Sequence, residues 1–248
     1  MDLGLDGRVY IITGGSRGLG FATAQALVAD GARVVLSSRN PEKAAESLGP
    51  LAIGVPADLA DPGTPDRLIG AATSRFGRLD GALISVGGPA QGTAAAMTDE
   101  QWRSAFETVF LGSLRAIRMI ASALSEGGAI GVVLSTTAKM PLTGLGLSNG
   151  LRPGLAMAAK DMADEFGPRG IRIVGLLPGR VMTDRNRELF AASADPAAAA
   201  AEAAGAIPLR RIGRPEEFGK VAAFLLSPAA GYVTGASIPV DGGYLRAL

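Results

Sequence analysis

The chain has 248 residues, of which 48% are hydrophobic and 19% charged, so it can build a large core and gives no sign of disorder. Its 24 Lys plus Arg residues nearly balance 23 Asp plus Glu without a block of like charge, which favours a small-molecule ligand over nucleic acid or a membrane surface. The absence of Cys and His excludes disulfides, thiol chemistry, an imidazole base and the usual zinc sites, so we expect no metal centre.

The first seven residues carry two Asp and no apolar run, which is unlike a signal peptide. No stretch reaches the roughly 18 uninterrupted apolar residues that a membrane span needs. We therefore expect a cytoplasmic protein.

Short runs rich in Val, Ile and Leu alternate along the chain with longer segments of helical period. Continuous hydrophobicity indicates strands buried on both faces, and intervening helices indicate right-handed crossovers between parallel strands. The sequence thus predicts one α/β domain over residues 1–248, a three-layer doubly wound parallel sheet of about seven strands. The expected strands are 8–13, 33–38, 51–55, 81–85, 130–134, 171–177 and 237–240.

Helices fill the intervals between these strands. One is predicted over 19–30, and another begins after Thr98, because Gln101 follows at the spacing of a capping box. Residues 191–206 are mostly alanine, interrupted by Pro196 and Gly205. This stretch is either a solvent-facing helix or a mobile lid, and we expect the loop 181–206 to shape the substrate pocket.

A glycine-rich turn, Thr13-Gly14-Gly15-Ser16-Arg17-Gly18-Leu19-Gly20, follows the first strand and leads into the first helix. Glycines permit a tight turn and let the backbone approach a pyrophosphate, while the amides at the helix N-terminus face the anion. In this position the turn predicts dinucleotide binding.

The spacing of this turn resembles the T-G-x-x-x-G-x-G pattern of the short-chain dehydrogenase/reductase family, and the resemblance covers nearly the whole chain. Supporting segments are Ala57-Asp58-Leu59, Pro168-Arg169-Gly170-Ile171 leading into Pro178-Gly179-Arg180, and Thr234-Gly235 through Asp241-Gly242-Gly243. The resemblance implies a Rossmann fold and a small carbonyl or alcohol substrate. It also implies a homo-oligomer, tetramer or dimer, paired through residues 238–248.

Charge indicates which nicotinamide cofactor binds. An acidic residue at the end of the second strand would bond a ribose hydroxyl, whereas this chain has Ser38 and Arg39, and Arg17 adds a second positive charge for the 2′-phosphate of NADP(H). Alternatively, both arginines are ordinary solvated side chains. By resemblance, Asp58 would bond the adenine amino group. The expected cofactor-binding residues are Gly14, Ser16, Arg17, Gly18, Leu19, Gly20, Ser38, Arg39, Asp58, Leu59, Ser85, Val86, Gly87, Arg152, Pro178, Gly179 and Val181.

The resemblance also locates the catalytic positions. The family uses a Tyr acid, a Lys four residues later, a substrate-orienting Ser and a helical Asn that holds a water. Here Ser148 and Arg152 stand at the Tyr and Lys positions, Ser135 is retained, and Val109 replaces the Asn. The family's N-N-A-G after the fourth strand has become Ile84-Ser85-Val86-Gly87. The Ser-Asn-x-x-Arg replacement resembles a minority branch similar to ketoacyl-carrier-protein reductases.

These replacements are not chemically equivalent. A phenol titrates near pH about 10, whereas a serine hydroxyl is a far weaker acid, so Ser148 would relay a proton through water. Arg152 keeps its proton but can bind ribose or steady an oxyanion. Pro153 predicts that the helix begins at Gly150 or later, so that Ser148 and Arg152 need not share a face. The plainer alternatives are that both are ordinary residues of a helix start and that Ser135 caps a strand end.

Three functions follow as hypotheses. The first is an NADPH-dependent oxidoreductase with Ser135, Ser148 and Arg152 in the catalytic site. The second is an NADP(H)-binding protein without dehydrogenase activity that acts as a sensor or as an assembly partner of active relatives. The third is another reaction on this scaffold, such as hydration or isomerisation, with the nucleotide as a structural group.

Overall fold

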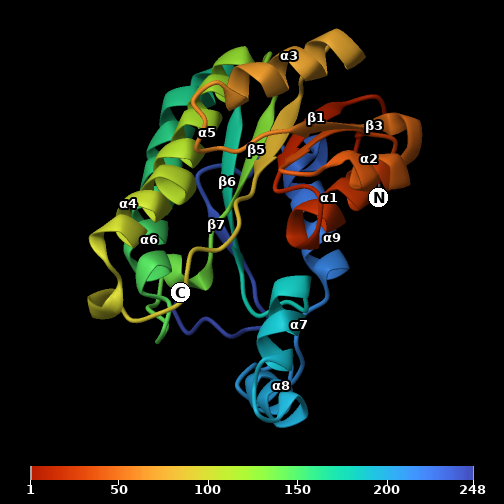
Figure 1. Cartoon of the computed structure of the whole chain (residues 1–248). Coiled ribbons are helices and arrows are strands. Elements are labelled where there is room, and N and C mark those ends of the chain that lie inside the picture. Colours follow the sequence, from red (N-terminus) through yellow and green to blue (C-terminus); the bar gives the residue numbers. More distant parts are fainter. Residues whose placement is uncertain (1, 248) are drawn as a thin grey trace.

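The computed structural model of the chain describes residues 2–247 and contains one sheet of seven parallel strands in the order β3-β2-β1-β4-β5-β6-β7 (Figure 1). The predicted fold class is confirmed, and every predicted strand is present to within one residue at each end. The strands are β1 Val9–Thr13, β2 Arg33–Ser38, β3 Ala52–Pro56, β4 Gly81–Ile84, β5 Ala129–Val133, β6 Arg172–Pro178 and β7 Ser237–Val240.

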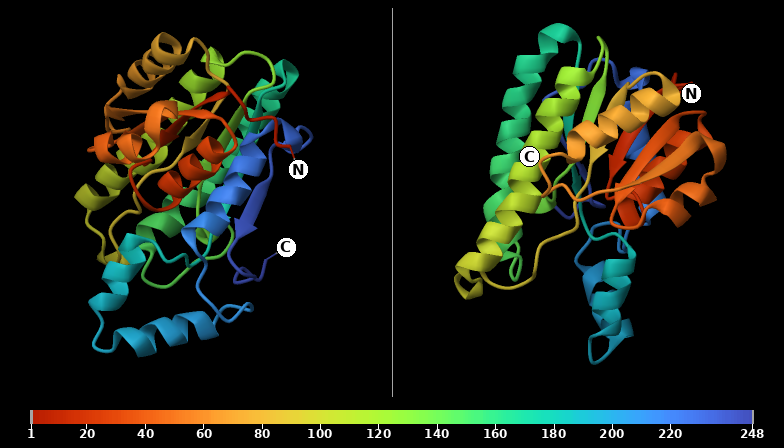
Figure 2. Two further views of the ribbon diagram at one scale, coloured as in Figure 1. Left: turned by 90° about the vertical axis from the view of Figure 1, so that its right-hand side faces the viewer. Right: turned by 45° about the horizontal axis from the view of Figure 1, so that its top comes forward.

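Helices cover both faces of the sheet (Figure 2). One face packs against α3 Thr64–Phe76, α5 Gly112–Ala123 and α6 Gly146–Phe166. The other packs against α1 Gly18–Ala29 and α9 Pro215–Leu226. Along β1, Val9 and Ile11 belong to the first core and Tyr10 and Ile12 to the second, all fully buried. This double burial explains why the inner strands have continuous apolar runs.

Two shorter helices complete these layers. Helix α2 Glu42–Ser47 packs against β3, and α4 Asp99–Ala105 precedes α5. The predicted capping box at Thr98 is confirmed: Thr98 Oγ1 accepts the Gln101 N–H at 3.3 Å, and Gln101 Oε1 accepts the Thr98 N–H at 2.9 Å. Among residues 2–247, no helix is long and apolar enough to cross a membrane.

The strand order reverses between β1 and β4, which are adjacent although β2 and β3 lie between them in the sequence. The ends of these two strands are tied together because Thr13 Oγ1 donates to the Ser85 carbonyl and accepts the Ser85 N–H, each at 2.8 Å. In sheets of this type, ligands bind at the carboxyl ends of the strands where the order reverses. The topology therefore indicates a ligand position beside Thr13.

Helices α7 Asp184–Ala191 and α8 Pro196–Gly205 project away from the sheet (Figure 1). No residue of α8 is buried, so this stretch is a solvent-facing helix. Pro196 is its first residue, where a missing N–H costs nothing, and Asp195 caps it by accepting the Ala198 N–H at 2.9 Å. Pro196 and Gly205 thus bound the helix rather than interrupt it.

The expectation that the next helix begins at Gly150 or later is wrong, because α6 begins at Gly146 and contains Pro153. Tertiary contacts override the local preference of proline. The Gly146 N–H donates to the Gly92 carbonyl at 2.8 Å, and the Asn149 amide bonds both the N–H and the carbonyl of Leu142, at 3.0 and 2.8 Å. With the first turn held from outside, the helix tolerates the single hydrogen bond that proline removes.

Candidate functional site

The glycine turn has the geometry that a close approach of backbone to a ligand requires. Gly14 and Gly18 have φ of +58° and +59°, which L side chains avoid. A Cβ on Gly14 would lie 2.7 Å from the Ser85 carbonyl oxygen, and one on Gly20 would lie 2.5 Å from the Gly14 carbonyl oxygen. Helix α1 begins at Gly18, so the amides of Gly18, Leu19 and Gly20 are in its first turn, where no helical carbonyl pairs with them. This turn can hold an anion.

Polar and charged groups gather at the ends of β2 and β3. Ser38 Oγ is buried without a hydrogen-bond partner, and the exposed Arg39 has no carboxylate of the described residues within 4.0 Å. Arg17 is mostly exposed, with Nη1 3.9 Å from Glu188 of α7. Asp58 Oδ1 accepts the Ala60 N–H at 2.9 Å. The next residue, Leu59, is buried.

The other predicted cofactor-binding residues lie at the same edge of the sheet. Ser85 begins the segment that follows β4 and is bonded to Thr13, while Pro178 ends β6. A Cβ on Gly179 would lie 2.5 Å from the Asp241 Cβ, so this turn also requires glycine. Val181 is buried and pairs with Gly213.

Hydrogen bonds join two of the three predicted catalytic residues around the end of β5. Ser135 Oγ accepts the Thr137 N–H at 3.1 Å, and Ser148 Oγ lies 2.8 Å from Thr137 Oγ1. Arg152 Nη1 donates to the Val133 carbonyl at 2.6 Å, two residues before Ser135. Ser148 and Arg152 are both buried and lie one turn apart on α6, so they share its inward face, contrary to the expectation drawn from Pro153.

Val109, at the position of the family's Asn, is also buried. It lies in a π-helical turn, Phe106–Leu111, and belongs to a small apolar cluster with Ala105, Leu147 and Leu151. This part of the site therefore offers no hydrogen-bonding side chain at that position.

Arg152 is an isolated buried charge. Its residue is 4% exposed, and no carboxylate of residues 2–247 lies within 4.0 Å of its guanidinium. Burial lowers the pKa of Arg152 to about 10, so the group is still protonated at neutral pH. Its Nε has no partner; in the described part of the chain, only this atom and Ser38 Oγ are buried side-chain polar atoms without one. Such groups are costly unless a ligand completes their hydrogen bonding.

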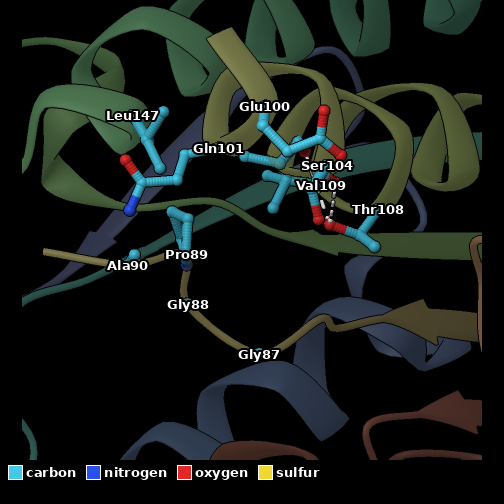
Figure 3. A pocket seen from close by; sticks show the side chains of 11 residues that line it. Gly87, Gly88, Pro89, Ala90, Glu100, Gln101, Ser104, Thr108, Val109 and Leu147 are labelled. Atoms are coloured by element: carbon cyan, nitrogen blue, oxygen red, sulfur yellow. Dashed lines mark hydrogen bonds between the residues drawn. The ribbon is translucent and has the colours of Figure 1, made fainter. Parts of the chain in front are cut away.

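A cavity of about 380 Å³ opens between the segment after β4 and helix α4 (Figure 3). Gly87 is the one predicted site residue that lines it, and no residue of 181–206 does. Its apolar part includes Val109 and Leu147, and the polar side chains come from α4 and the π-helical turn. The lining residues are Gly87, Gly88, Pro89, Ala90, Glu100, Gln101, Ser104, Ala105, Thr108, Val109 and Leu147.

The α4 residues that line this cavity were not identified from the sequence. The capping box located Gln101 at the start of a helix but did not indicate that its side chain lines a cavity. Because Gln101 Oε1 accepts the Thr98 N–H, the two N–H groups of its side-chain amide remain available (Figure 3). Sequence reasoning also missed Arg185 of α7, whose guanidinium donates to the carbonyls of Gly88 and Pro89 at 2.6 and 2.9 Å. Nothing in the sequence indicates this long-range contact.

Comparison with known proteins gives consistent matches over the whole chain. Residues 14–245 match the family described as enoyl-(acyl carrier protein) reductase. An uncharacterised oxidoreductase of Methylorubrum extorquens is 32% identical, covering 96% of this chain and 98% of its own length. A 3β-hydroxysteroid dehydrogenase of Eggerthella lenta is 31% identical, covering 96% and 94%.

Solved structures are similar over their full length. The L-sorbose reductase of Gluconobacter frateurii, complexed with NADPH and L-sorbose, superposes with a TM-score of 0.93 at 30% identity and covers all of both chains. An NADPH-dependent reductase involved in bacilysin biosynthesis superposes with a TM-score of 0.90 at 26% identity, covering 97% of this chain and 99% of its own.

Proposed function

Because this chain belongs to the short-chain dehydrogenase/reductase family of oxidoreductases, we propose that it is an NADP(H)-dependent enzyme that reduces a small carbonyl compound or oxidises the corresponding alcohol. The observation that carries the proposal is the pair of buried, unpartnered polar atoms, Ser38 Oγ and Arg152 Nε, at the strand-end edge that carries the glycine turn. We assign the site to one domain, residues 1–248, with 181–206 as its substrate segment, which contacts the cavity lining through the hydrogen bonds of Arg185 to Gly88 and Pro89.

The residues present fit a dinucleotide. The first-turn amides of α1 would hold the pyrophosphate, and Ser38 Oγ would bond the adenosine ribose. Arg39 and Arg17 would bind the 2′-phosphate, since both guanidiniums are exposed and neither has a close carboxylate partner among the residues that the structure describes; the Arg17 contact at 3.9 Å is long for a hydrogen bond. Arg152 would bond the nicotinamide ribose through Nε. NADPH in the Gluconobacter frateurii enzyme supports this choice of cofactor.

The chain's own groups account for the rest of the chemistry. When bound, the reduced nicotinamide supplies the hydride. Ser135 Oγ accepts the Thr137 N–H, so its own hydrogen is available to a carbonyl oxygen, where negative charge develops during reduction. The positive charge of Arg152 stabilises that charge in a site of low dielectric constant. Ser148 is too weak an acid to replace a phenol, so a water beside it supplies the proton.

The cavity beside Gly87 would accept the part of the substrate remote from the reacting carbon. Its volume of about 380 Å³ suits a small molecule, and the hydroxyls of Ser104 and Thr108, the Gln101 amide and the Glu100 carboxylate suit a hydroxylated one.

Calorimetry with NADPH and NADH tests the first half of the proposal. We expect tighter binding of NADPH, and absence of heat with either nucleotide would overturn the proposal. NADPH oxidation with a panel of aldehydes and ketones tests the second half. Ser135→Ala should lower kcat by about tenfold or more, as expected for loss of an oxyanion donor, whereas Ser122→Ala on the exposed side of α5 should not.

A second candidate function is NADP(H) binding without dehydrogenase activity. It is favoured by the residue types at the two positions, because the buried Val109 is apolar and the Ser148 hydroxyl is a far weaker acid than a phenol. Tight NADPH binding without turnover would support it. The double variant Ser148→Tyr with Arg152→Lys separates the two: a large gain in reductase activity would show that the missing acid limits the reaction.

A further inference from the structure

Thr137 contacts both serines of the proposed site. Its backbone N–H donates to Ser135 Oγ at 3.1 Å, and its side-chain hydroxyl lies 2.8 Å from Ser148 Oγ. Thr137 is 2% exposed and Ser148 is 8% exposed, so the hydroxyl pair is shielded from solvent. Buried hydroxyl pairs are held in fixed geometry, because no water competes for the bond.

Counting hydrogens shows what this arrangement leaves free. The Thr137 and Ser148 hydroxyls have two hydrogens and share one hydrogen bond, and neither makes another within residues 2–247. One hydrogen of the pair is therefore unused. Ser135 Oγ receives the Thr137 N–H and donates to no atom of these residues, so its hydrogen is unused as well. Two donors, joined through Thr137, thus remain for an oxygen atom of a ligand.

We propose that Thr137 is a positioning residue of the catalytic site, which fixes Ser135 through its N–H and Ser148 through its hydroxyl so that both serines present a hydrogen to the substrate oxygen. This role rests on the proposed oxidoreductase function. In this role the Thr137 hydroxyl donates to Ser148 Oγ, so the hydrogen of the Ser148 hydroxyl is left for the substrate oxygen.

The bond to Ser148 is not needed to hold α6 in place. The start of this helix is already fixed by the Gly146 bond to Gly92 and by the two bonds between Asn149 and Leu142. Loss of the Thr137 hydroxyl should therefore alter the orientation of Ser148 rather than the fold around it.

Three variants of Thr137 test this role. Thr137→Val removes the hydroxyl at nearly constant shape, Thr137→Ser keeps it, and Thr137→Ala removes it together with a methyl group, so the test does not depend on how valine packs. The matched control is Thr136→Val. The Thr136 side chain is next to Thr137 in the sequence and is equally buried, but it makes no hydrogen bond with the described residues. Each variant is assayed for kcat, for KM and for NADPH affinity by calorimetry.

We expect Thr137→Val and Thr137→Ala to lower kcat by about tenfold, the loss of one hydrogen bond, with the Kd of NADPH unchanged within about twofold. Thr137→Ser should recover most of the rate, and Thr136→Val should resemble the wild type. Adding Thr137→Val to Ser148→Ala should cause little further loss, because the two residues act as a unit.

Three results would overturn this role: wild-type kcat in Thr137→Val, a parallel loss of NADPH affinity, or independent effects of the two changes in the double variant. If the wild type oxidises NADPH and Thr137→Val matches it, only the role of Thr137 fails. If the wild type binds nucleotide but turns over no carbonyl compound, the proposed oxidoreductase function fails and this role fails with it.

Discussion

At the scale of single residues, Arg152 has an unusual combination of charge and environment. A buried guanidinium without a carboxylate beside it loses hydration and gains one carbonyl hydrogen bond in exchange. Selection for folding alone would favour an apolar side chain here. The retained charge is explained by a ligand that completes its hydrogen bonding, a trade of stability for function found at many binding sites.

Arg152→Met should therefore stabilise the free protein and weaken nucleotide binding. Relief of an unsatisfied buried donor is worth on the order of 1–3 kcal/mol, and each kcal/mol raises Tm by about 2–4 °C in a chain of this size. Calorimetric Tm with and without NADPH measures both effects, with the exposed Arg118→Met as the control. A lower Tm for the free Arg152→Met protein would contradict this account.

The stabilisation expected from Arg152→Met should decrease at high pH. Because burial lowers the pKa of Arg152 to about 10 in the folded state, the unfolded state binds more protons from about pH 10 up to the ordinary arginine value. The penalty of the buried charge is thus present in full below pH 10 and decreases above it. The difference in unfolding free energy between Arg152→Met and the wild type should be constant from pH 7 to about 9 and shrink at higher pH.

At the scale of elements, the strands could be predicted from the sequence and the start of α6 could not. The inner strands β1, β2, β4, β5 and β6 are buried on both faces, so the apolar run of each reflects its own surroundings, as in β1, whereas the edge strands β3 and β7 are only partly buried. The first turn of α6 depends instead on contacts with Gly92, which is far away in the sequence, and with Leu142, which belongs to no recognisable motif. The same holds for the site. The glycine turn has a local pattern, whereas the contacts of Thr137 and Arg185 exist only after folding.

Helix α7 lies close to two segments of the proposed cofactor site. Arg185 donates two hydrogen bonds to the segment after β4, while Glu188 lies near Arg17 of the glycine turn. A Cβ on Gly88 would lie 2.1 Å from Arg185 Nη1, so glycine at this position leaves room for the guanidinium. The hydrogen bonds of Arg185 thereby couple the substrate segment to the segment after β4.

Arg185→Ala should release α7 and α8, and with them part of the nucleotide affinity. We expect faster limited proteolysis within 184–205 and an NADPH Kd raised by about tenfold, the equivalent of one charge-assisted hydrogen bond. Arg187→Ala is the matched control, because within residues 2–247 the Arg187 side chain bonds only Asp184 of the same helix. Equal proteolysis rates for the two variants would refute the coupling.

At the scale of the whole molecule, the two edges of the sheet differ. Helix α2 packs against the β3 edge. The β7 edge has exposed aromatic side chains nearby in the sequence: Phe224 on α9 is 36% exposed, and Tyr232, before β7, is fully exposed. Large exposed apolar side chains and an unpaired strand edge are each typical of surfaces that another copy covers.

We therefore expect a homo-oligomer in which a twofold axis pairs the β7 edges of two copies. A twofold contact uses the same surface on both partners, so one substitution alters the interface twice and should have a large effect. In sedimentation velocity, Phe224→Glu combined with Tyr232→Glu should reduce the particle mass by half or more, because each copy would bring two carboxylates into an apolar contact. Leu189→Glu, at a similarly exposed residue of α7, should leave the mass unchanged. A monomeric wild type at micromolar concentration would show instead that these aromatic side chains face solvent.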